Sequence, residues 1–264
     1  METTDPTVLA LHIAATIRRL AAGATGPTCY RPPLVAIAGA DDPRFLQLQH
    51  TLHPGHALPS DLLQGAQAVV AFFLPFAPEI VAANAHHPSA VHRSWAVAYV
   101  ETNALIASIT AGLIAQLGAV GVAAAAQPAT HNFDPVSLHS TWSHKSAAVI
   151  AGLGSFGLHQ MVITGAGCAG RFGSLAVGTP LPAGIVGEAT IEPAAARQHC
   201  LYYLDGSCME CVAACPVHAL DPAAGLDKAA CYRHLLTIAR EFTGLGLADV
   251  CGKCAVLGPC AMEG

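Results

Sequence analysis

The stretch Cys208-Met-Glu-Cys211-Val-Ala-Ala-Cys215-Pro216 decides how this sequence is interpreted. Five more cysteines accompany it in the last 65 residues: Cys200, Cys231, Cys251, Cys254 and Cys260. A CxxCxxxCP run is typical of ferredoxins, in which four soft thiolates hold each cubane cluster. Eight thiolates therefore predict two [4Fe–4S] clusters and a low-potential electron-transfer or reductase function.

The spacing also predicts how the eight ligands divide between the two clusters. In two-cluster ferredoxins the cysteine that precedes proline ligates the other cluster. This crossing assigns one cluster to Cys200, Cys208, Cys211 and Cys260. It assigns the other cluster to Cys215, Cys231, Cys251 and Cys254. The ferredoxin run would begin at position 205, where Asp205 stands, so Asp205 in place of Cys200 stays open as a ligand.

Zinc is the alternative metal. The CxxC pairs at 208/211 and 251/254 would make a zinc ribbon, but the remaining four cysteines would then have no role. Cys29 and Cys168 lie apart from the motif, and we expect both to be inert buried thiols.

Composition limits the possible partners and compartment. The chain has 264 residues, of which 53% are hydrophobic and 11% charged, and its net charge is −5. No run of Lys or Arg is present, so nothing indicates a nucleic-acid surface. The first residues lack a basic and apolar leader, and thiolate clusters require a reducing environment, so we expect the cytoplasm.

Hydrophobic periodicity predicts a mixed α/β fold before the cysteines begin. We expect helices over 7–22, 94–117 and 140–151, and strands over 34–38, 67–76, 120–126, 173–178 and 185–191. The uncharged stretch 102–126 is rich in alanine and interrupted by polar residues, which favours a buried helix and a strand over a membrane span. Composition changes between 192 and 199, which predicts an α/β domain over 1–192 and a cysteine-rich domain over 193–264.

Residues 151–157, Ala-Gly-Leu-Gly-Ser-Phe-Gly, contain a GxGxxG pattern. The segment before it is predicted to be helical, and no acidic residue follows at about 20 positions, so a dinucleotide fingerprint is not favoured. The glycines instead indicate close approach of a flat cofactor or of another backbone segment. Arg171 is one of the few charges in an apolar region, where it would bind a cofactor's phosphate or carboxylate or be tied to backbone carbonyls.

Taken together, these segments resemble the epoxyqueuosine reductase family and, more distantly, the corrinoid reductive dehalogenases. The resemblance covers about residues 130–260: Ser143 to Ala148, the glycine-rich 151–157, Gly170-Arg171-Phe-Gly-Ser174 and the cysteine pattern. It implies a nitroreductase-like α/β domain that holds a corrinoid, and a ferredoxin-like domain with two [4Fe–4S] clusters that delivers electrons to it. The chain looks similar to a short branch of the family, without a helical-repeat tail.

The resemblance also suggests roles for particular residues. The implied cofactor-binding residues are His144, Lys145, Gly152, Gly154, Gly157 and Arg171. The family has a proton-donating aspartate upstream of the glycine-rich segment, and Asp134 is the candidate here. Tyr99 is a second candidate proton donor, considered from its residue type alone.

Two functions follow from these observations. The first is an iron–sulfur oxidoreductase that receives electrons from a ferredoxin- or flavodoxin-type donor and passes them to a corrinoid, with a flavin less favoured, to reduce an organic substrate. The substrate would be a small molecule or a modified base, although the charge does not support tRNA, and no membrane partner is expected. The second is an electron-transfer or reductive-activator protein that acts on a partner protein without substrate chemistry of its own.

Overall fold

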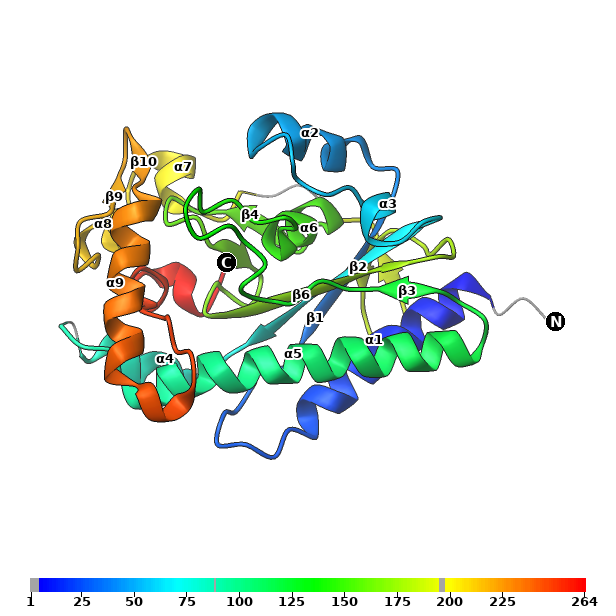
Figure 1. Cartoon of the computed structure of the whole chain (residues 1–264), viewed down its shortest axis with the longest axis horizontal. Helices are drawn as coiled ribbons and strands as arrows, with labels where there is room; N and C mark the ends of the chain where they lie inside the picture. The colour runs from blue at the N-terminus through cyan, green and yellow to red at the C-terminus, as the bar shows by residue number, and fades with distance from the viewer. Residues whose placement is uncertain (1–4, 88, 195–197) are drawn as a thin grey trace.

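A six-stranded sheet, in which all neighbouring strands are antiparallel, lies at the centre of the computed structural model (Figure 1). The structure describes residues 5–87, 89–194 and 198–264. The strand order is β3-β6-β2-β1-β7-β8. The strands are β1 (Leu34–Gly39), β2 (Ala68–Pro75), β3 (Ala124–Ala125), β6 (Gly170–Val177), β7 (Gly184–Val186) and β8 (Ile191–Glu192).

The central strand β2 is buried along its whole length. It pairs with β1 on one side and with β6 on the other, from Ala68 opposite Val177 to Pro75 opposite Gly170. Alternate side chains point to opposite faces of a strand, so Val70 and Phe72 join one core and Val69 and Phe73 join another. An unbroken apolar run is what a strand covered on both faces requires.

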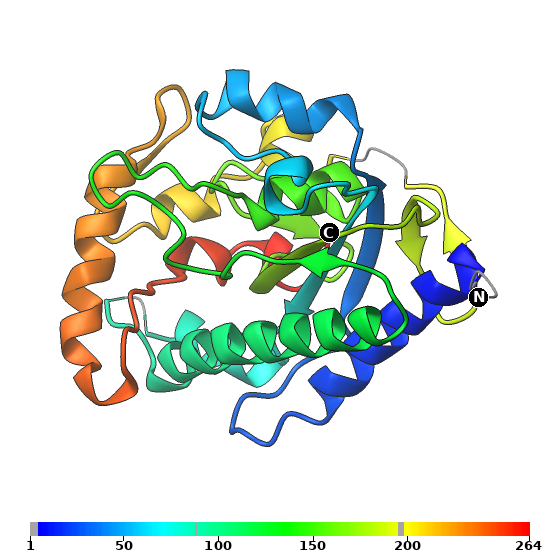
Figure 2. The same ribbon diagram turned by 45° about the vertical axis from the view of Figure 1, so that its right-hand side comes forward.

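Helices cover both faces of the sheet (Figures 1 and 2). One face packs against α1 (Pro6–Ala22) and α5 (Arg93–Ala119), and the other against α2 (Pro43–Thr51) and α6 (His144–Ala151). The remaining helices of this part are α3 (Pro59–Leu62) and α4 (Pro78–Ala85). Helices α1, α2 and α6 are preceded by the N-cap residues Asp5, Asp42 and Ser143, whose side chains accept hydrogen bonds from free backbone N–H groups of the first turn.

Helix α5 is long and apolar enough to cross a membrane when judged by length and composition alone. In this fold its Ile106, Ile109 and Leu113 side chains are buried against the sheet and α1. Its Glu101 carboxylate accepts a hydrogen bond of 3.0 Å from the backbone N–H of Thr28. Helix α5 is therefore a core helix, as the sequence predicted.

The cysteine-rich part lies at one end of the sheet (Figure 1). Its elements are α7 (Leu201–Asp205), α8 (Glu210–Ala213), β9 (Leu220–Asp221), β10 (Gly225–Leu226), α9 (Lys228–Glu241) and the 3-10 turns η1 (Thr243–Leu245), η2 (Lys253–Ala255) and η3 (Pro259–Ala261). The end of the chain returns to the sheet: the N–H groups of Cys168 and Ala169 donate to the carbonyls of Cys260 and Ala261, at 2.9 and 3.1 Å. These two hydrogen bonds thus join the cysteine-rich part to the segment that leads into β6.

Most predicted elements are present, with some corrections. The strand expected over 120–126 is only the two-residue β3, because Val120 and Gly121 close the end of α5 with turn hydrogen bonds. The helix expected from 140 begins at His144, after the Ser143 cap. The hairpin of β4 (Gly154–Phe156) and β5 (Val162–Thr164) was not predicted. The mixed α/β class is confirmed.

Candidate metal and cofactor site

The first cysteine cavity lies between α7, α8 and the end of the chain and has a volume of about 250 Å³. Four thiols line it: Cys200, Cys208, Cys211 and Cys260. Cys200 precedes α7, and Cys211 lies within α8. The cysteines that the ferredoxin crossing assigned to one cluster are therefore brought to a single cavity by three separate segments.

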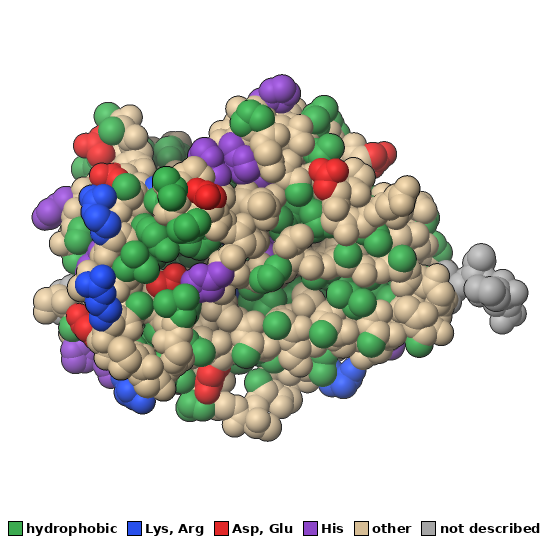
Figure 3. All heavy atoms as spheres, in the orientation of Figure 1, with side chains coloured by type: hydrophobic (Ala, Val, Ile, Leu, Met, Phe, Trp, Pro, Cys, Tyr) green, Lys and Arg blue, Asp and Glu red, His purple; other side chains and the backbone are tan. Residues whose placement is uncertain are grey.

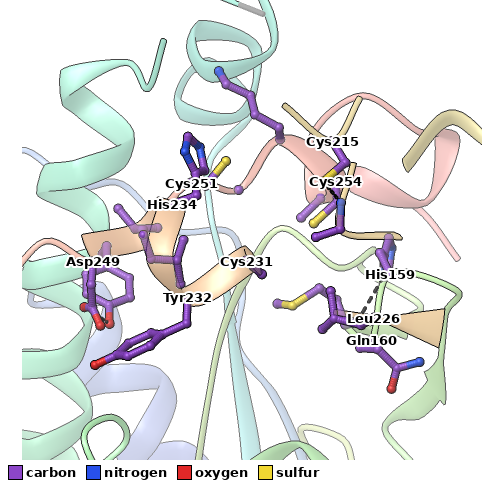
Figure 4. Close-up of a pocket in the computed structure, with 18 of the residues that line it drawn as sticks. His159, Gln160, Cys215, Leu226, Cys231, Tyr232, His234, Asp249, Cys251 and Cys254 are labelled. Carbon is purple, nitrogen blue, oxygen red and sulfur yellow. Dashed lines mark hydrogen bonds between the residues drawn. The ribbon is translucent and has the colours of Figure 1, made fainter. Parts of the chain in front are cut away.

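The second cysteine cavity has a volume of about 380 Å³ and reaches the end of the sheet where β2 stops and β6 begins. The cysteines that line it include Cys215, Cys231, Cys251 and Cys254 (Figure 4). Cys231 projects from α9, Cys215 follows α8, and the Cys251–Cys254 pair frames η2. This is the set assigned to the other cluster.

Burial and the neighbouring thiols raise the pKa values of two of these cysteines, one in each cavity. Burial and then the neighbouring Cys260, Cys200 and Cys208 raise the pKa of Cys211 to about 11. Burial and then Cys251 and Cys215 raise the pKa of Cys231 to about 11. Four adjacent thiolates repel one another in a buried site, so these cavities favour a bound cation or metal cluster that would neutralise them.

Asp205 lies outside the first cavity. Its carboxylate is exposed and accepts a 2.9 Å hydrogen bond from the backbone N–H of Ser207. That bond and the Ser207 side chain lower the pKa of Asp205, which is what a turn-capping carboxylate shows. Of the two alternatives left open by the sequence, the geometry favours Cys200 as the ligand.

Two buried polar groups beside the second cavity test whether an anionic cluster fits there. Lys253 is 2% exposed, and its ammonium donates hydrogen bonds to the carbonyl and side-chain oxygens of Asn84, at 2.6 and 2.9 Å. Among the described residues no carboxylate lies within ion-pair distance of it. The indole Nε1 of Trp95, which lines the cavity, has no hydrogen-bond partner in the described part of the chain. A buried cation and an unpaired donor fit a negatively charged group such as a thiolate-bound cluster.

A third cavity of about 370 Å³ lies next to the second, under the 129–143 loop. The two share the lining residues Thr130, Phe133, Lys145, Met161, Gly170 and Arg171. The Lys145 ammonium donates a 2.7 Å hydrogen bond to the carbonyl of Gln160, and burial lowers its pKa to about 8. The Arg171 guanidinium lies 4.2 Å from the centre of the Tyr99 ring, and its buried Nε has no hydrogen-bond partner among the described residues. Both cations therefore face a space with room for a further ligand.

Tyr99 and Asp249 form a buried pair on the wall of the second cavity. The Tyr99 hydroxyl donates to Asp249 Oδ1 at 2.7 Å and lies 3.1 Å from Thr130 Oγ1. Burial raises the pKa of Tyr99, and Arg171 opposes this shift. The phenol is thus protonated at neutral pH. The geometry places Tyr99, a candidate proton donor, at the cavity.

Asp134, the other candidate proton donor, lies on the exposed part of the 129–143 loop. Its Oδ1 accepts hydrogen bonds from the N–H groups of Ser137 and Val136, at 2.6 and 3.0 Å. These bonds, Ser137 first, lower the pKa of Asp134. It is not among the residues that line the described cavities, so its role stays a prediction.

His144 lines the third cavity, but both of its ring nitrogens already have protein partners. Nε2 lies 3.1 Å from the carbonyl of Pro128 and donates to it, so Nδ1 accepts from the Ser174 hydroxyl at 2.7 Å. Burial lowers its pKa to about 4, so the ring is neutral. A cofactor would meet the face of this ring rather than a free nitrogen.

The three glycines of the 151–157 segment pack closely against other residues of the chain. Gly152 ends α6 with a positive φ of 90°, a conformation that favours glycine. A Cβ on Gly154 would lie 2.0 Å from the carbonyl oxygen of Ile163, and one on Gly157 would lie 2.8 Å from the His159 ring. None of the three lines a described cavity, so the geometry favours close backbone packing, and their cofactor role stays a prediction.

Gly154 provides a test of this packing. We expect Gly154→Ala to lower the free energy of unfolding by about 1–3 kcal/mol, because the added methyl group would force β4 and β5 apart. Gly165→Ala is the matched control, since a Cβ there meets no atom within 4 Å. Denaturant unfolding of both variants checks this. Equal stability of the two would contradict the packing role of Gly154.

Sequence reasoning did not identify two residues of the site. They are Asp249 on the second cavity and His159 between the first and second cavities, whose Nε2 lies 3.6 Å from Sγ of Cys168. Cys168 is buried, as predicted. Cys29 is exposed, so the prediction that it is a buried thiol is wrong. Only Asp249 carried a signal, since it lies two residues before Cys251 in an otherwise apolar segment.

Comparison with known proteins places this arrangement in a known fold. No protein-family model and no curated protein matches the sequence. Among solved structures, the epoxyqueuosine reductase of Bacillus subtilis is 17% identical, with a TM-score of 0.61 over 97% of this chain and 66% of its own. An epoxyqueuosine reductase with an epoxyqueuosine-modified tRNA-Tyr stem loop is 18% identical, with a TM-score of 0.58 and the same coverage. A catabolic reductive dehalogenase is 17% identical, with a TM-score of 0.62 over 98% of this chain and 33% of its own.

The predicted resemblance is therefore confirmed at the level of the fold. At these identities the similarity establishes shared architecture with two groups of reductases. The chain spans about two thirds of the length of the epoxyqueuosine reductases it matches.

Proposed function

We propose that this chain is an iron–sulfur oxidoreductase with two [4Fe–4S] clusters that passes electrons to a corrinoid and reduces an organic substrate, in the manner of epoxyqueuosine reductases. The observation that carries the proposal is the sorting of eight cysteines into two cavities in the predicted sets of four. The second of these cavities adjoins a third that contains Lys145 and Arg171. Metal centres and a further cofactor would thus lie along one route from the surface to the substrate.

The finer structural assignments belong to the same proposal. The α/β part over 1–192 would be nitroreductase-like, and 193–264 would be a ferredoxin-like module. Its support is that β8 ends at Glu192 and α7 begins at Leu201, on either side of the proposed boundary. The clusters supply single-electron transfer at low potential. The eight thiolates would ligate them, and the buried ammonium of Lys253 would offset part of the net negative charge.

The third cavity would hold the corrinoid, which supplies a strongly reducing metal when bound. Arg171 and Lys145 would bind its polar periphery, because both are cationic donors and the buried Nε of Arg171 has no hydrogen-bond partner among the described residues. His144 would fix the 127–130 segment against β6 through Pro128 and Ser174. The loop over 129–143 would exclude water from the reacting centre.

Tyr99 is the residue that the geometry favours as proton donor. It lines the second cavity beneath Arg171, a residue that the second and third cavities share. It is protonated at neutral pH and is oriented by Asp249 and Thr130. Asp134 is ionised at neutral pH, since backbone hydrogen bonds lower its pKa. One structural neighbour is described with its catalytic aspartate loop swung out of the active site. A comparable movement of the 129–143 loop would be needed to bring Asp134 to the third cavity.

The proposal extends to partners. The electron donor would be a ferredoxin- or flavodoxin-type protein in the cytoplasm. A neighbour contains a modified tRNA stem loop, which supports a modified base as substrate, with a small organic molecule as the other candidate. Figure 3 shows Lys and Arg as separate side chains on the face in view, so charge gives no support to a long tRNA contact on that face.

Anaerobic purification followed by metal and spectral analysis tests the proposal. We expect about eight irons and eight sulfides per chain, and uptake of about one hydroxocobalamin. Eight irons without cobalamin uptake would favour the alternative, an electron-transfer or activator protein that acts on a partner. Zinc in place of iron would refute both functions.

A further inference from the structure

His159 is buried between the two cysteine cavities and has not been assigned a role. It is 4% exposed and lines both the first cavity and the second. It follows the glycine-rich segment, in the turn between β4 and β5. The absence of a side chain at Gly157 makes room for its ring, since a Cβ there would lie 2.8 Å from Cε1.

Hydrogen bonds determine which ring nitrogen carries the proton. The backbone N–H of Met161 donates to Nδ1 of His159 at 3.0 Å, so Nδ1 is an acceptor and the neutral ring is protonated at Nε2. Nε2 lies 3.5 Å from Sγ of Cys260 and 3.6 Å from Sγ of Cys168. Its N–H therefore points at a pair of sulfur atoms.

Cys260 is the more suitable acceptor of the two. Cys168 is 0% exposed, and its thiol hydrogen is directed to the carbonyl of Ala255 at 3.6 Å, as in a protonated structural thiol. Cys260 lines the first cavity with three other cysteines. A thiolate there accepts a hydrogen bond more strongly than a thiol does.

We propose that His159 is a positioning residue that donates an N–H···S hydrogen bond to the Cys260 thiolate and thereby raises the reduction potential of the first cluster relative to the second. This inference rests on the proposed function. Hydrogen bonds to cluster sulfur atoms stabilise the reduced, more negatively charged state, which makes the potential less negative. His159 is a donor to a ligand and is not itself a ligand.

Replacement of the donor tests the inference on the full chain with both clusters loaded. His159→Phe keeps an aromatic ring but cannot donate. We expect the midpoint potential of one cluster to become more negative, with about a tenfold change in its reduction equilibrium, which is about 59 mV for one electron. The second cluster is expected to keep its potential. His159→Gln, which can place an amide N–H near the Nε2 position, is expected to restore part of the shift.

Controls separate the histidine from its surroundings. His50→Phe alters an exposed histidine on α2 and is expected to change neither potential. Cys168→Ala removes the other sulfur near Nε2 and is expected to leave the first cluster close to its original potential. Unchanged potentials in His159→Phe at full iron content, or a shift only in Cys168→Ala, would overturn the inference while the proposed function stands.

A spectroscopic measurement on the unaltered protein is independent of variant folding. With ¹⁵N-labelled histidine, pulsed EPR of the reduced first cluster is expected to detect a weak coupling to one ring nitrogen and to an exchangeable proton. A strong coupling typical of a direct ligand, or none, would overturn the inference. A chain that binds no iron would overturn the proposed function and this inference together.

Discussion

Cys254→Ala is expected to remove one of two metal centres: the iron content should fall from about eight to about four atoms per chain. Cys254 lines the second cavity, and burial followed by Cys251 and Cys231 strongly raises its thiol pKa, so the site holds a thiolate only with metal present. Substrate reduction should fall by more than the roughly 10- to 100-fold typical of residues that support metal ligands, since the electron route is interrupted. Iron analysis and EPR of the reduced protein provide the measurement.

The chain offers matched controls for this experiment. Cys29→Ala alters an exposed thiol far from the motif in sequence and should keep about eight irons. Cys211→Ala should also leave about four irons, because it removes the cluster of the first cavity. The cluster that remains is then that of the second cavity, so its EPR signal should differ from the signal of Cys254→Ala. If Cys254→Ala retained both clusters, the assignment of this cavity would be wrong.

Tyr99→Phe should lower turnover by about 100- to 10,000-fold, the usual contribution of a general acid. The phenol lies on the wall of the second cavity, and its hydroxyl is held by Asp249 at 2.7 Å. Removal of the hydroxyl keeps the ring beneath the Arg171 guanidinium, so the packing of that cation should persist. Iron content and cobalamin affinity are therefore expected to stay unchanged, and single-turnover kinetics should locate the loss in the protonation step.

Asp134→Asn is the comparison that distinguishes the two candidate acids. Its side chain is exposed and caps the turn at residues 136 and 137, and asparagine can retain those hydrogen bonds. If Tyr99 is the donor, Asp134→Asn should stay within a few-fold of the original turnover. A large loss in Asp134→Asn with near-normal Tyr99→Phe would reverse the assignment and indicate that the 129–143 loop closes during the reaction.

The sequence predicted those parts of the structure that depend on local pattern. The apolar run at 67–76 became the buried strand β2, and the periodicity at 7–22 became α1. Strand β2 and helix α1 can be read from residue spacing because they depend on local pattern. The cysteine spacing also predicted two sets of four, whose members line two separate cavities, and their role as cluster ligands stays a prediction.

The remaining parts of the site depend on contacts between distant segments. Tyr99 and Asp249 are 150 positions apart and meet only because α5 and the segment after η1 pack at the same end of the sheet. His159 and Cys260 meet across 101 positions when the end of the chain returns to β6. The glycines at 152–157 matched a cofactor pattern, yet their neighbours are Ile163 and His159, which no periodicity could indicate.

If the proposed function holds, the return of the chain end to β6 would link iron supply to the survival of the whole protein. The carbonyls of Cys260 and Ala261 accept hydrogen bonds from Cys168 and Ala169, and the carbonyl of Met262 accepts one from Arg31 at 3.0 Å. On the proposed assignment, a chain that lacks its first cluster would loosen this segment and expose backbone groups where β6 begins. Proteases recognise such open segments, so cells short of iron should degrade this protein rather than accumulate an inactive form.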